Sequence, residues 1–254
     1  MKAFKGLLWK DYSISKLGFF GWLALLLFFY VIGVGLAGYY GYPELSVVIV
    51  FMEGLAHMIF MPLILLNMLM VEGRTQLWLH SIQPGWKLLL SKFLVAFSYS
   101  IVSFLFVDLL GVISLTWQEA DILYLPWKES VFFNIAVTSS AVYFSCWVFF
   151  YWTVYYGLAK SPLLKKFRWF ILVLILVLHQ VISSLLVAID WFREFMNLWT
   201  IKVRGSFFIE AGPENFSTGS EIIHLPVIPF ILYAVLTVII FLTASWILER
   251  KVEV

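Results

Sequence analysis

Charged residues are scarce in this sequence. They make up 13% of its 254 residues, and hydrophobic residues make up 63%, whereas soluble proteins contain roughly 25% charged and 45–50% apolar residues. A water-soluble domain could not bury so much apolar surface, so the composition excludes one and indicates a membrane protein. The net charge is only +2 and the basic residues are dispersed, so no nucleic-acid-binding surface is indicated.

Cysteine is nearly absent, and histidine is rare. A single cysteine, Cys146, excludes an internal disulfide and a C-x-x-C metal or redox motif. It lies in an apolar run, where we expect a buried thiol. The four histidines, His57, His80, His179 and His224, are scattered without the spacing of zinc ligands, so the sequence predicts no metal site.

The motifs of nucleotide hydrolysis and of common hydrolases are also missing. The sequence contains no G-x-x-x-x-G-K-[ST] loop that would cradle the phosphates of ATP. It has no H-E-x-x-H zinc-protease motif, no G-x-S-x-G nucleophile elbow and no kinase signature. We therefore expect no enzyme activity and no cofactor in this chain.

What the sequence does contain is long apolar segments. A helix needs about 20 apolar residues to cross the hydrocarbon core of a bilayer. Six segments meet this length, at approximately residues 17–40, 45–71, 93–117, 131–159, 169–189 and 225–248. The sequence predicts an all-α integral membrane protein in which residues 1–254 form a single transmembrane domain.

The basic residues indicate the orientation of these helices. If the amino terminus is cytoplasmic, 13 of the 17 Lys and Arg residues fall on the inner side and 4 on the outer side. Short cytoplasmic loops of membrane proteins carry this excess of positive charge. We expect a multi-pass protein of the cell membrane with both termini in the cytoplasm.

The segment before the first span has the pattern of an amphipathic helix. Over residues 1–16, a helical wheel places Phe4, Leu7, Leu8 and Tyr12 on one arc, and Asp11 falls inside that arc. Such a helix would lie along the inner membrane surface. Two interpretations remain open, an anchor to lipid headgroups and a docking site for another protein.

The inner loop at residues 72–87 reads as a short helix followed by a turn. Pro84-Gly85 is a pair that suits a type II turn, and the third span begins soon after it. We expect a polar helical elbow against the inner face of the membrane.

These inner segments resemble the type 2 ABC exporter permeases. The matching pattern is an acidic residue, a Thr, a short helix ending in Ser, a Pro turn, a basic residue and Ser-Lys, here Glu72, Thr75, Ser81, Pro84, Lys87, Ser91 and Lys92. The opening residues Leu8-Trp9-Lys10-Asp11 are similar to the connecting helix with which such permeases begin. The turn itself, Ile82-Gln83-Pro84-Gly85-Trp86, departs from the Leu-Pro-Val-Ser-Arg-like turn common in the family.

The resemblance implies a function and partners. In that family the elbow is a coupling helix that receives motion from a separate ATPase, which holds ATP and Mg²⁺. Contact with the ATPase would then come from Asp11, Glu72, Arg74, Thr75, Gln76, Ser81, Gln83 and Lys87. The resemblance further implies a second permease chain, identical or paralogous, in a bacterial plasma membrane. The exported substrate would be a peptide, a drug or a lipid-like molecule.

The longest outer loop covers residues 190–224. Its front half interleaves aromatic residues such as Trp191 and Phe195 with polar ones, which suits a short helix in the outer interface. Type 2 exporters are similar in carrying short re-entrant helices here. The back half, residues 205–224, is polar and contains Gly212, Pro213 and Gly219, so we expect a surface loop.

Four ionisable residues lie within predicted spans, where charges are costly and are candidates for function. Glu53 and His57 are one helical turn apart, Asp108 lies on the third span and His179 on the fifth. They could line a substrate path or a proton-sensitive gate. They could equally be structural, as a Glu53–His57 pair or a carboxylic acid kept neutral by burial.

An alternative function belongs to another class. The chain could be a secondary transporter, or an envelope scaffold or sensor, with no link to ATP. A secondary transporter would more often show an inverted repeat with broken spans near the midplane. Pro62 lies in the second span, but we find no matching break in a second half.

Overall fold

The computed structural model describes residues 2–75, 83–117, 127–211 and 216–252, without the side chains of residues 2, 129, 203–211, 216–223, 251 and 252. The elements in chain order are α1 Lys2–Tyr40, α2 Glu44–Thr75, α3 Gly85–Trp117, α4 Trp127–Ala159, α5 Pro162–Lys165, α6 Arg168–Ala188, α7 Asp190–Met196, β1 Thr200–Ala211, β2 Phe216–Pro226, α8 Ile228–Ile247 and a π-helical turn Leu248–Val252.

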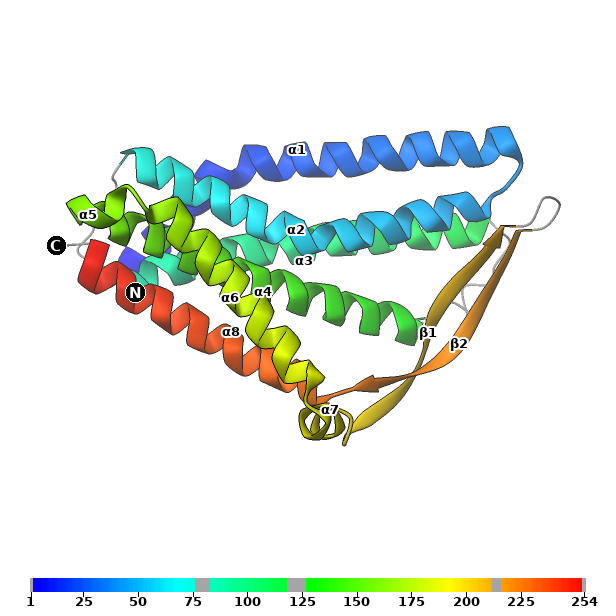
Figure 1. Ribbon diagram of the computed structural model, residues 1–254. Helices are drawn as coiled ribbons and strands as arrows, with labels where there is room; N and C mark the ends of the chain where they lie inside the picture. The colour runs from blue at the N-terminus through cyan, green and yellow to red at the C-terminus, as the bar shows by residue number, and fades with distance from the viewer. Residues whose placement is uncertain (1, 76–82, 118–126, 212–215, 253–254) are drawn as a thin grey trace.

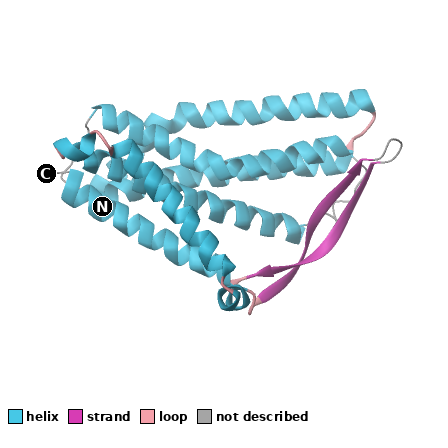
Figure 2. Cartoon of the chain, in the orientation of Figure 1, coloured by secondary structure: helices cyan, strands magenta, loops and turns pink. Residues whose placement is uncertain are grey.

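Six of these helices are long and apolar enough to cross a membrane, namely α1, α2, α3, α4, α6 and α8. Figures 1 and 2 show them in one bundle, with both chain termini at one end and the β-hairpin at the other. We call these the terminal end and the hairpin end. The prediction of an all-α, multi-pass membrane protein is confirmed.

Several helices begin earlier than their predicted spans. The helix expected over residues 1–16 is present, but it continues without a break into the first span as α1. Likewise α3 begins at Gly85 rather than near residue 93. The predicted spans stopped where apolar residues stopped, whereas backbone hydrogen bonding carries a helix on through polar residues at its ends.

The predicted type II turn at Pro84-Gly85 is wrong. Such a turn needs a positive φ at the glycine, and the described glycine with a positive φ is Gly41, between α1 and α2. Gly85 is instead the first residue of α3, and the carbonyl of Pro84 accepts the backbone N–H of Lys87 at 2.9 Å. Pro84-Gly85 is therefore the start of a helix, and most of the short helix predicted before it lies outside the described residues.

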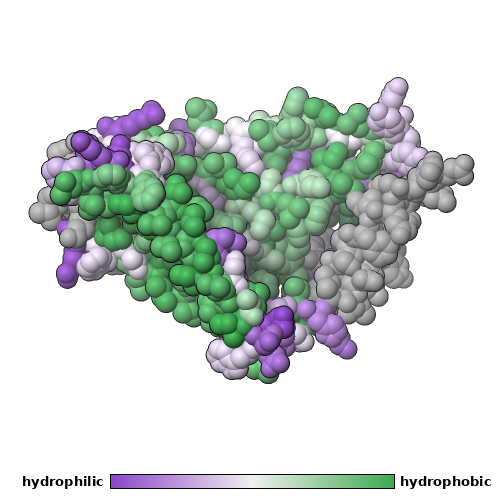
Figure 3. All heavy atoms as spheres, viewed as in Figure 1, coloured by the Kyte–Doolittle hydropathy of each residue, from purple (hydrophilic) through white to green (hydrophobic). Residues whose placement is uncertain are grey.

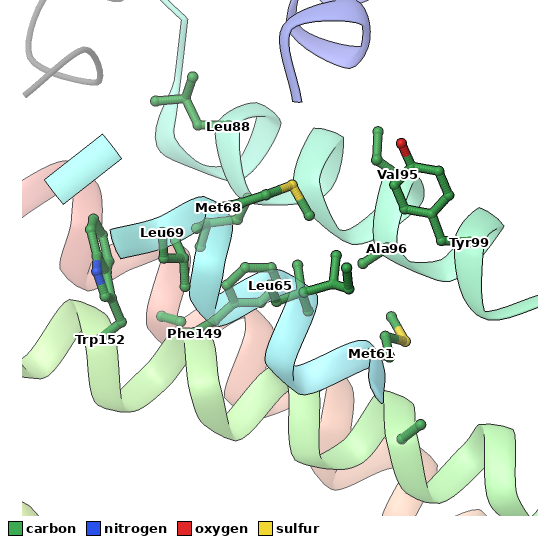
Figure 4. Packing of buried hydrophobic residues seen from close by; sticks show 14 of the residues in the cluster. Met61, Leu65, Met68, Leu69, Leu88, Val95, Ala96, Tyr99, Phe149 and Trp152 are labelled. Carbon is green, nitrogen blue, oxygen red and sulfur yellow. The ribbon is translucent and has the colours of Figure 1, made fainter. Parts of the chain in front are cut away.

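Helix α2 lies at the centre of the packing, in contact with α1, α3 and α4. Its fully buried side chains include Phe60, Met61, Leu65 and Met68. Figure 4 shows this part of α2 between α3, which contributes Val95, Ala96 and Tyr99, and α4, which contributes Phe149 and Trp152. Near the hairpin end α2 and α4 approach closely at Gly54, where a Cβ atom would lie 2.6 Å from the ring of Phe133.

The outer surface of the bundle is apolar. In Figure 3 hydrophobic residues cover the visible faces of the helices, and polar residues gather at the terminal end and around α7. Helix α6 has no buried residue at all among its 21 residues. A surface of this kind suits lipid, which solvates apolar side chains without cost.

The loop at residues 190–224 contains more structure than the sequence predicts. Helix α7 confirms the predicted short helix, but the predicted surface loop over 205–224 is wrong. Strands β1 and β2 pair antiparallel from Thr200↔Pro226 to Ala211↔Phe216, with an irregularity between Arg204 and Ser206. The β-branched and aromatic residues of this segment favour strands, and they outweigh its glycines and polar residues.

Candidate functional site

The buried acidic and basic side chains of the described structure gather at two levels of the bundle. The first level is at the terminal end, where α1, α2 and α3 meet. Asp11 of α1, Glu72 of α2 and Lys92 of α3 are each at most 2% exposed. Lys10, beside Asp11, remains partly exposed. We call these four residues the ion cluster.

Lys92 is the centre of the ion cluster. Its Nζ lies 3.1 Å from Oδ1 of Asp11 and 2.8 Å from Oε1 of Glu72. Lys10 also pairs with Glu72, and the hydroxyl of Ser91 donates to Oδ2 of Asp11 at 2.6 Å. Two carboxylates thus face two ammonium groups, so the buried charges compensate one another, as burial of charge requires.

The amphipathic pattern of the first turns explains how Asp11 reaches this place. Leu7, Leu8 and Ile14 pack against the hydrophobic core, and Asp11 on the same arc is carried inward with them. The hydroxyl of Tyr99 donates to the carbonyl of Tyr12 at 3.2 Å, a further tie between α1 and α3. The protein contact considered for Asp11 is therefore made within this chain.

The residues predicted to contact an ATPase lie in different surroundings. Asp11 and Glu72 are buried in the ion cluster, so they do not face the surface. Arg74 and Thr75 are exposed at the end of α2, and Lys87 lies over the ring of Trp86. Gln83 belongs to the connection before α3, whereas Gln76 and Ser81 lie outside the described residues.

Lys92 is not among the residues predicted to contact the ATPase, although it is one of the residues on which the family resemblance rests. The signal that could have singled it out is a lysine inside the apolar start of a span, because such charges are rare and usually paired. Its partner Asp11 is 81 residues away in the sequence. Spacing alone could not have predicted that pair.

The second level lies toward the hairpin end and is centred on His57. Its Nδ1 lies 2.8 Å from the main-chain oxygen of Glu53, and its Nε2 lies 2.8 Å from the hydroxyl of Ser103. A carbonyl only accepts, so Nδ1 carries a hydrogen, and Nε2 of the neutral ring accepts from Ser103. The indole N–H of Trp22 donates to the same hydroxyl at 3.0 Å.

The predicted side-chain pair between Glu53 and His57 is therefore wrong. His57 uses the main-chain oxygen of Glu53, because a residue one turn later on a helix can reach that carbonyl. Among the described residues, neither carboxylate oxygen of Glu53 has a hydrogen-bond partner, and the residue is only 6% exposed.

Asp108 is held by α4. The side-chain amide of Asn134 donates to its Oδ2 at 2.8 Å, and the hydroxyl of Ser130 lies 3.5 Å from Oδ1. Asn134 was not among the predicted residues, although an asparagine within a span is itself a sign of contact between helices.

His179 lies apart from the other three predicted polar residues. On α6, its Nε2 is 3.1 Å from the hydroxyl of Tyr143, and its ring packs T-shaped against Trp147 with the ring centroids 4.7 Å apart. Tyr143 follows Asn134 by nine residues, about 13 Å along α4 at 1.5 Å per residue. The predicted path residues therefore occupy two separate places.

The described residues show no group of three His, Cys, Asp or Glu side chains that could hold a metal ion. What the two levels offer chemically is a compensated ion cluster at the terminal end and uncompensated acidic groups toward the hairpin end.

Comparison with known proteins adds one relative. No family model matches the sequence, and no solved structure gives a significant match. The chain is similar to a Bacillus subtilis (strain 168) protein named "Uncharacterized protein YhcE", with 25% identity over 264 residues. The similarity covers 100% of both chains.

Proposed function

We propose that this chain is the membrane-spanning permease subunit of an ATP-driven ABC exporter whose ATPase is a separate polypeptide. The supporting observation is the ion cluster. Glu72, Ser91 and Lys92, which carry the resemblance to type 2 exporter permeases, meet Asp11 of the opening helix at one buried point. Residues that the family resemblance names separately are thus in contact.

The ion cluster gives the elbow between α2 and α3 a mechanical role. A buried charge that loses its partner is strongly unfavourable, so the ion cluster would resist separation of α1, α2 and α3. In this proposal the three helices move together at the terminal end. A push on the exposed end of α2 would be passed to all three helices. In this proposal Asp11 and Glu72 hold the joint, and Arg74, Thr75 and Lys87 contact the ATPase.

The excess of basic residues at the terminal end supports a cytoplasmic location for both termini. The ATPase would then bind at that end, and the hairpin would face outward. The long described helices also fit this proposal better than a secondary transporter with broken spans, since α2 continues through Pro62 as one helix.

Helix α6 provides the surface for the second permease chain. Gln180 lies near the middle of this helix and is exposed. An amide facing lipid leaves its hydrogen-bonding groups unpaired, which costs free energy, and glutamine in membranes bonds across helices. Because an amide both donates and accepts, Gln180 of one copy can pair with Gln180 of a second copy.

The test first asks whether the neighbouring open reading frame encodes a P-loop ATPase, as this proposal requires. The two proteins should co-purify, and the ATPase in nanodiscs with the full chain should hydrolyse ATP faster than alone. Arg74→Glu should weaken this stimulation, because it reverses an exposed charge at the contact. Glu72 is unsuitable for charge reversal, since its side chain is buried.

Lys128→Glu is the matched control. It reverses an exposed charge at the opposite end of the bundle, on α4, and should leave the stimulation unchanged. Absence of a complex, or equal stimulation by the wild type and Arg74→Glu, would contradict the proposal.

A further inference from the structure

The carboxylate of Glu53 is buried and unpartnered. The residue is 6% exposed, and both carboxylate oxygens lack a hydrogen-bond partner among the described residues. A buried charge without a partner is strongly unfavourable, and proteins normally pair it. The ion cluster at the terminal end follows that rule, and Glu53 does not.

Asp108 lies at the same height in the bundle. Helices α2 and α3 run antiparallel, and two contacts fix how they are aligned. Toward the hairpin end, a Cβ atom on Gly111 would lie 3.3 Å from Val50. In the other direction, His57 bonds Ser103. On α2, Glu53 lies between Val50 and His57. On α3, Asp108 lies between their partners Gly111 and Ser103, at the corresponding height.

Helix α4 completes the same level. Phe133 lies against Gly54 and forms a ring pair with Phe51 at 5.0 Å. The next residue, Asn134, bonds Asp108. Glu53 and Asp108 therefore lie at the level where α4 contacts both helices, and the ring of Phe133 lies at the same level.

No cation compensates these acidic groups in the described structure. The ion pairs found there involve the ion cluster and the Arg193–Asp190 pair on α7, and none includes Glu53 or Asp108. This level of the bundle therefore combines the enclosed, unpartnered oxygens of Glu53, the carboxylate of Asp108 and the aromatic ring of Phe133. Ammonium and guanidinium groups are attracted to all three.

We propose that Glu53 and Asp108 form a recognition site for the cationic group of an amphiphilic organic molecule. This inference rests on the proposed export function and names its substrate class. A bare metal ion fits less well, because divalent cations require more oxygen ligands than these two carboxylates and one amide supply.

The test measures binding without any ATPase. The full-length protein is placed in nanodiscs, and rhodamine 6G, a lipophilic organic cation, is titrated against it by fluorescence anisotropy, with empty nanodiscs subtracted. Glu53→Gln should weaken binding about tenfold or more, because a charged acceptor is lost. Asp108→Asn should weaken binding less, because Asn134 already occupies one of its oxygens.

Glu44→Gln is the matched control, with the same chemical change at the start of the same helix. Its affinity for rhodamine 6G should equal that of the wild type. Nile red, an uncharged dye, should bind the wild type and Glu53→Gln equally.

The melting temperature gives a second readout. Glu53→Gln should raise it in the absence of dye, because the substitution removes an unpaired buried charge. Equal affinity of the wild type and Glu53→Gln for rhodamine 6G would overturn the inference, and so would a lower melting temperature. Since no ATPase is present, either failure is distinct from the loss of complex formation that would contradict the export function.

Discussion

The ammonium of Lys92 lies 3.1 Å from the carboxylate of Asp11, and both side chains are at most 1% exposed. The pair joins the opening turns of α1 to the start of α3. Glu72 adds the end of α2 to the same contact. The ion cluster thus holds α1, α2 and α3 together at the terminal end. In sequence, α1 and α2 are joined only at the opposite end of the bundle.

Loss of Lys92 should destabilise the protein strongly. Lys92→Met leaves Asp11 and Glu72 buried with only Lys10 as a counterion. Breaking a buried pair in this way costs about 3–5 kcal/mol. The melting temperature of the detergent-purified protein, followed by Trp fluorescence, should fall clearly below that of the wild type.

A double substitution tests whether the pair itself is responsible. Asp11→Asn combined with Lys92→Met should recover part of the lost stability, because the carboxylate left without its ammonium is neutralised. Lys87→Met serves as the control, since its partly exposed side chain is outside the ion cluster. If Lys87→Met lowers the melting temperature as much as Lys92→Met, the ion cluster is not what stabilises this end.

The hydroxyl of Ser103 should contribute more to stability than the hydroxyl of Ser98, an exposed serine on the same helix. The Ser103 hydroxyl joins His57 to Trp22, so Ser103→Ala removes the partner of the buried His57 Nε2 and of the part-buried Trp22 indole N–H. We expect a loss of about 1–3 kcal/mol, measured by thermal unfolding. Ser98→Ala should change stability little, because the exposed Ser98 hydroxyl bonds only the carbonyl of Leu94 in its own helix.

Two leucines on α2 allow the contribution of core packing to stability to be measured apart from the loss of hydrophobicity. Leu65 is fully buried and Leu63 is 51% exposed on the lipid-facing surface. Leu65→Ala should cost about 2 kcal/mol or more, because it opens a cavity in the core. Leu63→Ala should cost much less in the same thermal assay, and equal losses would argue against the packing of α2 between α3 and α4.

The hairpin register can be tested by cross-linking in a Cys146→Ser background. Ile201 and Leu225 are directly opposite each other, and opposite residues of antiparallel strands have Cβ atoms about 4.5–5.5 Å apart. Cysteines at both positions should form a disulfide under mild oxidation, detected by a mobility shift on reducing and non-reducing gels. Cysteines at Thr200 and Leu225 point to opposite faces and should link poorly. Preferential linking of the second pair would show that the register is shifted.

Much of the architecture could be predicted from the sequence alone. A spanning helix is a local property, because about 20 consecutive apolar residues suffice to cross the bilayer core. All six spans were therefore found, with errors confined to ends such as the start of α3. Helix α7 was predicted for the same reason, since its pattern is contained in seven residues.

Only the tertiary structure decided which residues meet. The side-chain partners of Asp11 and of His57 come from other helices, and these contacts depend on how the helices rotate and slide against each other. The hydrophobic pattern of a span constrains this alignment weakly, since lipid accepts apolar side chains on every face. The spacing of Glu53 and His57 on one helix predicts a side-chain pair, whereas the packing leaves the Glu53 carboxylate without a partner among the described residues.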